Sequence, residues 1–163
     1  MIIFEKIMIE ITEEKGVCIM FHINYKKYTF KIKEENKKEF IFDEIRKKWI
    51  RLTPEEWIRQ NFLQYLLKEK QYPASLIGIE KEIRLGELKK RCDIIIYKNS
   101  FPWMIIECKQ PGVVLDEQVF HQVLRYNQSL VSTYLVITNG SNNFGWEIEN
   151  GSLIEIDDLP IWK

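Results

Sequence analysis

Residues 91–109, with the sequence RCDIIIYKNSFPWMIIECK, constrain the fold of this chain more than any other stretch. They predict two strands, Cys92–Tyr97 and Trp103–Cys108, joined by a short loop of turn-forming residues. Side chains alternate between the faces of a strand, and here both faces are apolar. A sheet that is apolar on both faces needs cover on both. The stretch therefore predicts an α/β fold in which a mixed sheet is flanked by helices on both faces.

Apart from Lys98 beside the loop, the few charged residues of this stretch lie at its two ends. If the hairpin pairs symmetrically about Ser100, Tyr97 lies opposite Trp103 and Asp93 lies opposite Glu107. Glu107 and Lys109 then share one face of their strand. Opposed carboxylates repel each other, and a divalent cation removes the repulsion.

Carboxylate oxygens and a backbone carbonyl are ligands that suit Mg²⁺, which can activate a water molecule and neutralise a phosphoryl oxygen. A nearby lysine can orient that water or help to deprotonate it. Asp93, Glu107 and Lys109 therefore predict a Mg²⁺ site for hydrolysis. A simple salt bridge at the strand ends is the alternative. The three residues alone favour this salt bridge, so the choice depends on the flanking sequence.

Composition limits the classes of protein to which the chain can belong. A length of 163 residues and a hydrophobic fraction of 45% are typical of a globular protein. The formal net charge of zero argues against a simple electrostatic DNA binder. Three scattered cysteines and two histidines argue against a zinc site. No apolar run approaches the roughly 18 residues of a membrane span, so we expect a cytoplasmic protein without a membrane partner.

We expect two parts in the chain: a β-rich extension over residues 1–38, packed on the core, and a main domain over residues 39–163. The extension contains alternating apolar segments with a hairpin turn at residues 13–16. A local basic cluster follows, and it favours a solvated charged face over a phosphate-contacting edge. Its members are Arg46, Lys47, Lys48 and Arg51.

The sequence Thr53-Pro54-Glu55-Glu56 predicts the start of a helix, with Thr53 as the N-cap and proline in the first turn. The helix is expected to end near residues 72–73. Capping and the helix dipole account for both acids at its start. Its inward stripe consists of Trp57, Ile58, Phe62, Tyr65 and Leu66.

A first core strand is predicted at residues 76–85, where Glu80 supplies a further metal ligand or marks an exposed edge. Lys89, Lys90 and Arg91 are expected in the turn that follows. Basic residues beside carboxylates suit a phosphodiester substrate, although a charged turn is the default interpretation.

A second helix is predicted at residues 116–129, followed by a strand at 132–137 and a final hairpin with Asn150-Gly151 as its turn. Gln118, Gln122 and Tyr126 recur every four residues and so line one side of that helix. Gln and Tyr side chains in this spacing can bind a nucleotide by hydrogen bonding and stacking.

Four segments occur in a fixed order: YPASLIGIEKEIRLGELKKRCDIIIY, PWMIIECK, QVFHQVLRYN and YLVITNG. Together they resemble the N-terminal nuclease domain of type I restriction enzyme R subunits, most closely its small stand-alone bacterial forms, within the PD-(D/E)xK nuclease superfamily. The upstream segment LTPEEWIRQNFLQYLL is similar to the opening helix of the stand-alone proteins. The resemblance covers residues 40–140 and implies an αβββαβ core like that of restriction endonucleases.

The resemblance also implies roles for individual residues. Asp93 and Glu107 would be metal ligands with the backbone carbonyl of Cys108, and Lys109 would be the catalytic lysine. Glu80 would be the strand acid at the metal. Gln122 and Tyr126 would contact DNA.

The implied activity is Mg²⁺-dependent DNA endonuclease activity linked to restriction or DNA defence, with Mn²⁺ as a substitute metal. Expected partners are DNA and other restriction subunits, and a homodimer is left open. Two departures from the family are visible: Cys92 stands where proline often precedes the aspartate, and the chain has no P-loop and no room for a motor. A catalytically silent module that binds DNA or a partner protein is the alternative.

Overall fold

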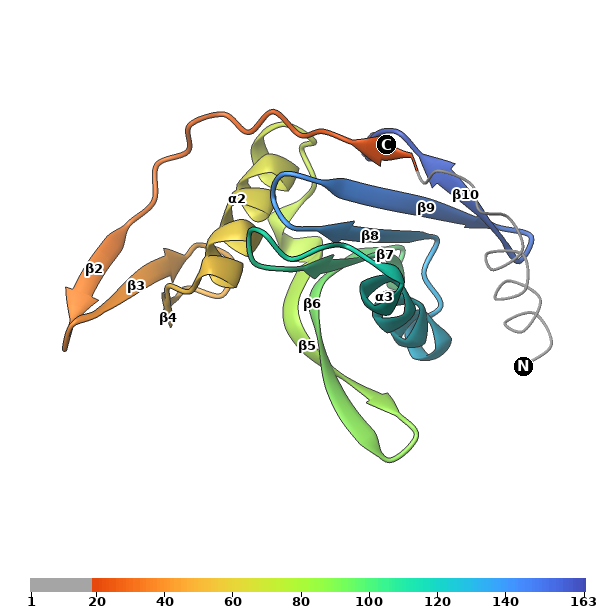
Figure 1. Cartoon of the computed structure of the whole chain (residues 1–163), viewed down its shortest axis with the longest axis horizontal. Helices are drawn as coiled ribbons and strands as arrows, with labels where there is room; N and C mark the ends of the chain where they lie inside the picture. Colours follow the sequence, from red (N-terminus) through yellow and green to blue (C-terminus); the bar gives the residue numbers. More distant parts are fainter. Residues whose placement is uncertain (1–18) are drawn as a thin grey trace.

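The computed structural model describes residues 19–163. The hairpin turn expected at residues 13–16 lies outside the described residues. Within the described part, no helix is long and apolar enough to cross a membrane. Residues 19–163 form a mixed α/β fold made mostly of strands, with two α-helices in this part of the chain (Figure 1).

Seven strands form the main sheet, in the order β1-β9-β8-β7-β6-β5 with β10 paired to β9. All of its strand pairs are antiparallel except β7 with β8, so the sheet is mixed, as the sequence predicted. The strands are β1 Met20–Phe21, β5 Ile77–Leu85, β6 Leu88–Lys98, β7 Phe101–Cys108, β8 Tyr134–Thr138, β9 Asn143–Glu149 and β10 Ser152–Ile156.

The β6–β7 hairpin keeps the predicted register at the end that carries the acids. Ile94 pairs with Ile106, as expected for a hairpin that is symmetric about Ser100. The same register places Asp93 near Glu107. Near the turn the prediction is wrong, because Tyr97 faces Pro102 instead of Trp103. Two residues with positive φ, Asn99 and Ser100, make a tight turn there, and an irregularity after Ile96 absorbs the one-residue shift.

Helix α2 (Pro54–Lys68) begins as predicted, with the Thr53 side chain accepting a hydrogen bond from the Glu56 backbone N–H. It ends four residues before the expected position, and Gln71 then adopts a left-handed conformation with a φ of 57°. Trp57 was expected to face inward, but it is 39% exposed. A short 3₁₀ helix, η1 (Ala74–Leu76), leads into β5.

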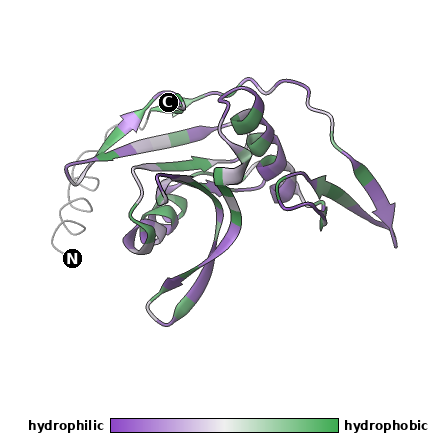
Figure 2. Ribbon diagram, turned by 180° about the vertical axis from the view of Figure 1, so that it is seen from behind, coloured by the Kyte–Doolittle hydropathy of each residue, from purple (hydrophilic) through white to green (hydrophobic). Residues whose placement is uncertain are grey.

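Two apolar clusters use alternating side chains of the central strands. Helix α2 contributes Phe62 and Leu66 to the first cluster, which also contains Ile94 and Ile106. Helix α3 (Glu117–Leu130) contributes side chains to the second cluster, which contains Ile95 and Ile105. Figure 2 shows the corresponding alternation of hydrophobic and hydrophilic segments along the ribbons. The central strands therefore carry buried apolar side chains in both clusters, as the alternation in the hairpin sequence predicted.

A separate three-stranded sheet consists of β2 (Ile32–Glu35), β3 (Lys38–Asp43) and β4 (Lys48–Arg51), in that order. The boundary expected between residues 38 and 39 lies inside the pairing of β2 with β3. The division of the chain into two domains stays a prediction. Figure 1 shows this sheet beside α2, away from the main sheet.

Strands β5 and β6 continue past the body of the protein as a two-stranded arm (Figure 1). Lys89, Lys90 and Arg91 belong to this arm as part of β6, not to a turn as predicted, because the turn is at Gly86-Glu87. The last hairpin agrees with its prediction, since Asn150 and Gly151 have φ values of 50° and 79°.

We predict that Gly140→Ala lowers the free energy of unfolding by about 2–4 kcal/mol. Gly140 has a φ of 90°, and a Cβ atom there would lie 2.5 Å from Cδ1 of Ile58 on α2. Gly86→Ala is the matched control, because Gly86 has a φ of 62° but no neighbour within 4 Å of its Cβ position. Urea unfolding should show a loss of only about 1 kcal/mol for the control. Equal losses in the two variants would contradict the close packing of this loop on α2.

Candidate active site

Lys109 follows the last residue of β7 and lies against the carboxylate of Glu107. Its Nζ donates hydrogen bonds to Oε1 of Glu107 at 2.7 Å and to Oε1 of Gln122 on α3 at 3.0 Å. Nε2 of Gln122 in turn donates to Oε1 of Glu107 at 2.6 Å. The three side chains therefore form a closed polar triangle at the end of β7.

Glu107 is an acid in an unfavourable position for its charge. The residue is only 4% exposed, and its second oxygen, Oε2, is buried without a hydrogen-bond partner. Burial and the nearby charge of Asp93 raise the pKa of Glu107 to about 7, against the opposing effect of Lys109. Around neutral pH, this carboxylate therefore lies close to the balance between its charged and neutral forms.

Asp93 lies at the start of the same strand pair, and both of its oxygens are bound. Oδ2 accepts a hydrogen bond from the backbone N–H of Cys108 at 2.7 Å, and Oδ1 accepts one from Nη2 of Arg59 at 2.7 Å. The same Arg59 nitrogen lies 3.5 Å from Oε1 of Glu55 at the start of α2. Burial and the charge of Asp93 raise the pKa of Glu55. Asp93, Glu107 and Glu55 therefore act on one another electrostatically.

Two arginines neutralise the acids on the α2 side. Arg59 pairs with Glu56 and Asp93. Arg46, only 10% exposed in its side chain, pairs with Asp43 at 2.7 Å, Glu56 at 2.6 Å and Glu80 at 2.6 Å. The prediction that Arg46 belongs to a solvated basic face is therefore wrong. It lies in the turn between β3 and β4 and ties the three-stranded sheet to α2 and β5.

Glu80 lies directly across from Asp93 in the β5–β6 pair, at an irregular position. The ladder pairs residues 79 with 94 and 81 with 92, and Glu80 between them has a φ of 48°. A positive φ at a non-glycine residue is a strained conformation that recurs at functional sites. The carboxylate of Glu80 lies 2.6 Å from Arg46 and 3.9 Å from Arg91. Glu80 therefore lies near Asp93, but its carboxylate is already paired with Arg46.

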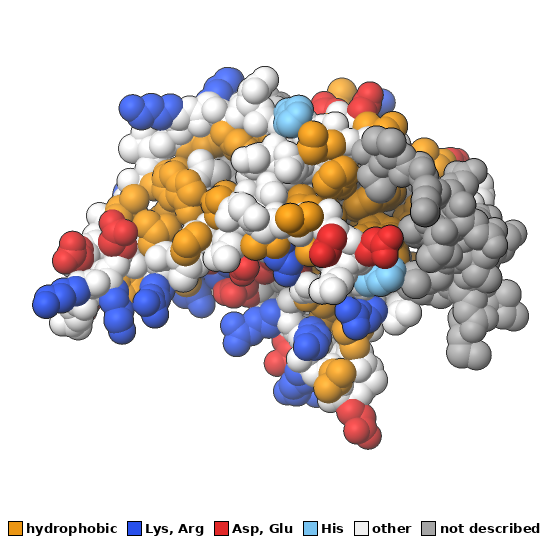
Figure 3. All heavy atoms as spheres, in the orientation of Figure 1, with side chains coloured by type: hydrophobic (Ala, Val, Ile, Leu, Met, Phe, Trp, Pro, Cys, Tyr) orange, Lys and Arg blue, Asp and Glu red, His pale blue; other side chains and the backbone are white. Residues whose placement is uncertain are grey.

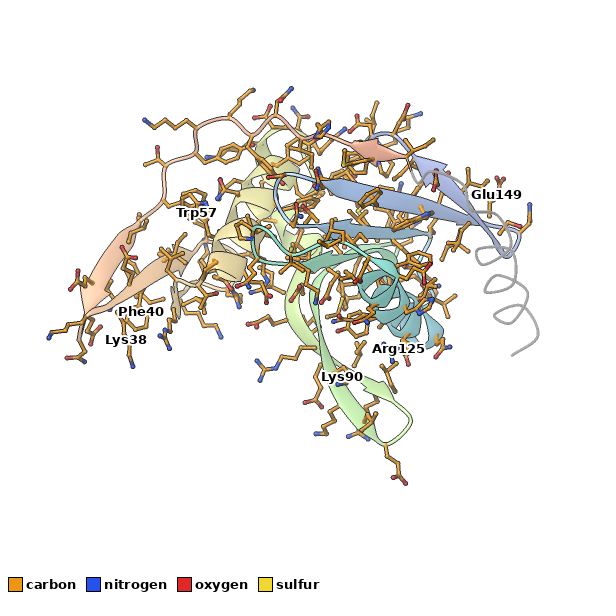
Figure 4. The ribbon with its side chains drawn as sticks, in the orientation of Figure 1. Lys38, Phe40, Trp57, Lys90, Arg125 and Glu149 are labelled. Atoms are coloured by element: carbon orange, nitrogen blue, oxygen red, sulfur yellow. The ribbon has the colours of Figure 1, made fainter. Side chains whose placement is uncertain are left out.

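The three basic residues expected to contact DNA are exposed on the β5–β6 arm. Side chains of Lys89 and Arg91 are 61% and 72% exposed, and Lys89 pairs with Glu82 at 3.1 Å. Figure 4 labels Lys90 on the same arm. In Figure 3, lysine and arginine side chains lie on this arm and along the edge of the three-stranded sheet, with acidic side chains between the two groups.

Gln122 and Tyr126 share the expected side of α3 and point to the site. Nε2 of Gln122 donates to the Tyr126 hydroxyl at 2.7 Å as well as to Glu107. The ring of Tyr126 is only 3% exposed and packs in the apolar cluster under α3. In this conformation Tyr126 positions Gln122, and it has no free face on which a base can stack. A DNA contact by Gln122 or Tyr126 stays a prediction.

Two neighbours of the acids, Arg59 and Glu55, were not among the predicted site residues. Arg59 follows Glu55 and Glu56 at spacings of four and three, which reads as an ordinary ion pair on a capped helix. The sequence gives no sign that the guanidinium reaches Asp93, thirty-four residues further along the chain. That contact depends on how α2 packs on the sheet.

A bound Mg²⁺ ion needs oxygen ligands that converge on one point. In residues 19–163, no three His, Cys, Asp or Glu side chains already form a metal-binding group. The unpartnered Oε2 of Glu107 and the adjacent Asp93 nevertheless fit a hard cation, which takes buried carboxylate oxygens as ligands. The Cys108 thiol is fully buried with a pKa well above its usual range, so a ligand from Cys108 is its carbonyl. The fit requires Arg59 to release Asp93.

The fold and the site define a class: a mixed α/β protein with an acid and a lysine at the carboxyl end of β7 and a second acid, Asp93, on the neighbouring antiparallel strand β6. A family model described as the type I restriction enzyme R protein N terminus matches residues 54–160. The chain therefore belongs to this family, which confirms the resemblance found in the motifs. Neither the search of curated proteins nor the search of solved structures found a match.

We predict that Glu107→Gln stabilises the protein at pH 8 by about 1–3 kcal/mol when metals are chelated. The folded-state pKa of Glu107, about 7, lies above its ordinary value of 4.5. Its contribution to stability is therefore full below pH 4.5 and is lost as the pH rises through 7. Urea unfolding should show the difference at pH 8 and show it shrinking towards pH 5.

The exposed Glu34→Gln is the matched control and should change little at either pH. A Glu107→Gln variant that is less stable than the parent at pH 8 would contradict the conclusion that the charge of Glu107 is unfavourable in the folded protein.

Proposed function

We propose that this chain is a Mg²⁺-dependent DNA endonuclease that hydrolyses phosphodiester bonds in restriction or DNA defence. One observation carries the proposal: Asp93 accepts a hydrogen bond from the backbone N–H of Cys108, next to Glu107, and Lys109 is bonded to Glu107 at 2.7 Å. The family match supports the link to restriction, and the αβββαβ core implied by the motifs is part of the proposal.

Three groups are proposed to hold the metal: Glu107 through Oε2, Asp93, and the Cys108 carbonyl. Glu80 is proposed as an outer acid, since it lies beside Asp93 but pairs with Arg46. Mg²⁺ in such a site supplies an activated water molecule and neutralises charge on the phosphoryl group, and Mn²⁺ can substitute for it. Its charge would also favour the ionised form of Glu107, whose pKa is otherwise raised.

Lys109 is proposed to hold the attacking water and the scissile phosphate as a cation. Burial lowers the pKa of Lys109, but the hydrogen bond and charge of Glu107 outweigh this effect and raise it overall. The ammonium therefore stays protonated near neutral pH and acts as a donor. Gln122 fixes its direction through the 3.0 Å hydrogen bond to Nζ.

DNA is the proposed substrate, and the exposed cations of the β5–β6 arm support this proposal. Lys89, Lys90 and Arg91 on the β5–β6 arm can neutralise phosphates on one side of the acids. Positive charge next to the acids compensates locally for the zero net charge of the whole chain. Other restriction subunits are proposed partners, and a homodimer stays a prediction.

The alternative function is a silent module that binds DNA or a partner protein. Its support is the bond between Arg59 and Asp93, because a guanidinium that permanently neutralises Asp93 would leave no role for a metal. The unpartnered oxygen of Glu107 favours the nuclease, since a binding module has no use for a buried acid with an unmet hydrogen-bond acceptor.

We predict that purified protein nicks or degrades DNA with Mg²⁺ or Mn²⁺, and that Lys109→Ala lowers the rate roughly 100-fold or more. Loss of the ammonium removes the donor that holds the water and phosphate. Gel assays on plasmid and on single-stranded DNA measure the rate. Circular dichroism and thermal unfolding check the fold.

Lys27→Ala, which removes an exposed lysine outside the site, is the matched control and should cleave at the parent rate. Parent protein that leaves every DNA form intact with either metal would overturn the nuclease proposal in favour of the silent module.

A further inference from the structure

The two faces of the three-stranded sheet differ in character. On one face, Ile41 and Asp43 of β3 are fully buried, and Asp43 is bound by Arg46 and by Gln60 of α2. The opposite face is open to solvent in the described part of the chain. The pairing registers place on it Lys31, Lys33, Glu35, Lys38, Phe40, Phe42, Trp49 and Arg51. We call these eight residues the aromatic–basic face.

Aromatic rings form the centre of the aromatic–basic face. Phe42 and Trp49 lie opposite each other on adjacent strands, with ring centroids 5.4 Å apart in an edge-to-face arrangement. Trp49 is 39% exposed, and Phe40 is partly exposed beside it. Rings in a core would be covered, so these side chains present surface that nothing in residues 19–163 buries.

Lysine ammonium groups lie over these rings. Nζ of Lys33 is 5.0 Å from the centroid of Trp49 and 5.7 Å from that of Phe40, and Nζ of Lys31 is 5.5 Å from that of Phe42. Lys38 and Arg51 add two further exposed cations, and Glu35 is the single acid of the face. Nζ of Lys33 also pairs with Glu35 at 2.9 Å. Exposed ion pairs and exposed cation–π contacts are both weak, so the ammonium groups can exchange to phosphates.

The sheet that carries the aromatic–basic face is connected to the candidate active site through β3 and Arg46. Strand β3 runs from the hairpin tip at Lys38 to Asp43, which is bound by the same Arg46 that binds Glu80. Figure 4 labels Lys38 and Phe40 on this sheet, on the other side of α2 from the arm that carries Lys90. The face precedes residue 54, so it lies outside the segment that the family model matches.

We propose that the aromatic–basic face is a binding site for single-stranded DNA. Bases stack on Trp49 and on the neighbouring phenylalanines, while the lysines move from the rings to the phosphates. Stacking requires bases whose faces are free, and a duplex does not offer them. An acidic peptide would satisfy the cations but leave the aromatic rings unused. The site extends the proposed function, but binding at this face does not require cleavage.

The test is fluorescence anisotropy with a labelled oligothymidine of about 15 nucleotides, in EDTA so that no metal-dependent cleavage occurs. Trp49→Ala should weaken binding roughly tenfold, and Trp49→Phe, which keeps a stacking ring, should bind within about threefold of the parent. Phe101→Ala is the matched control, because Phe101 is 72% exposed at the far end of β7 from Lys109. It should bind as the parent does.

Charge is tested with the double variant Lys33→Ala, Lys38→Ala. It should reduce the slope of log affinity against log salt concentration by about one to two, as expected for the loss of two phosphate contacts. Parent affinity in Trp49→Ala, or an unchanged salt slope in the double variant, would overturn the proposal. Equally tight, Trp49-dependent binding of polyglutamate would assign the face to an acidic protein instead.

The outcome is separable from that of the nuclease proposal. Protein that binds the oligonucleotide through Trp49 but never cleaves DNA would retain this inference and overturn the nuclease. If the parent protein cleaves DNA but Trp49→Ala binds the oligonucleotide with parent affinity, the nuclease proposal is retained and this inference is overturned.

Discussion

The structure depends on the compensation of buried negative charge in the middle of β6 and at the end of β7. Asp93 and Glu107 are both almost fully buried, and like charges so placed repel each other. Arg59 from α2 and Lys109 from the end of β7 supply the opposing positive charge. Arg59 and Lys109 come from different elements, so their bonds to the two acids hold α2, β6 and β7 in one arrangement. A buried acid left without its partner would cost several kcal/mol.

A second layer of ion pairs connects this centre to the three-stranded sheet. Arg46 binds an acid on β3, one on α2 and one on β5, so a single guanidinium joins three elements. The sheet is thereby fixed at one end while its aromatic–basic face remains exposed. If both proposals hold, one protein carries a place for cutting DNA and, connected through β3 and Arg46, a place for holding a single strand.

Much of this arrangement was predictable from the sequence, and the parts that were not share a physical cause. The apolar alternation of residues 91–109 predicted the central hairpin, and the position of Asp93 relative to Glu107 followed from its symmetry. The spacing of Gln122 and Tyr126 placed both on one side of α3. Local patterns could not show that Arg59 crosses from its helix to Asp93, or that Arg46 is buried, because these contacts join segments far apart in the chain. Likewise, a regular strand would place Ile79 and Ile83 on one face, but Glu80 between them has a positive φ, and Ile79 joins the cluster under α2 whereas Ile83 joins the one under α3.

We propose that the charge of Asp93 and Glu107 serves a divalent cation and that Arg59 takes the place of this cation in the metal-free protein. A crystal structure of the protein soaked with Mn²⁺ would show whether it does. We expect an anomalous peak about 2.0–2.3 Å from Oε2 of Glu107 and from an oxygen of Asp93, with Arg59 turned away towards Glu56. Arg59 still bonded to Asp93, with no anomalous peak at Glu107, would contradict it.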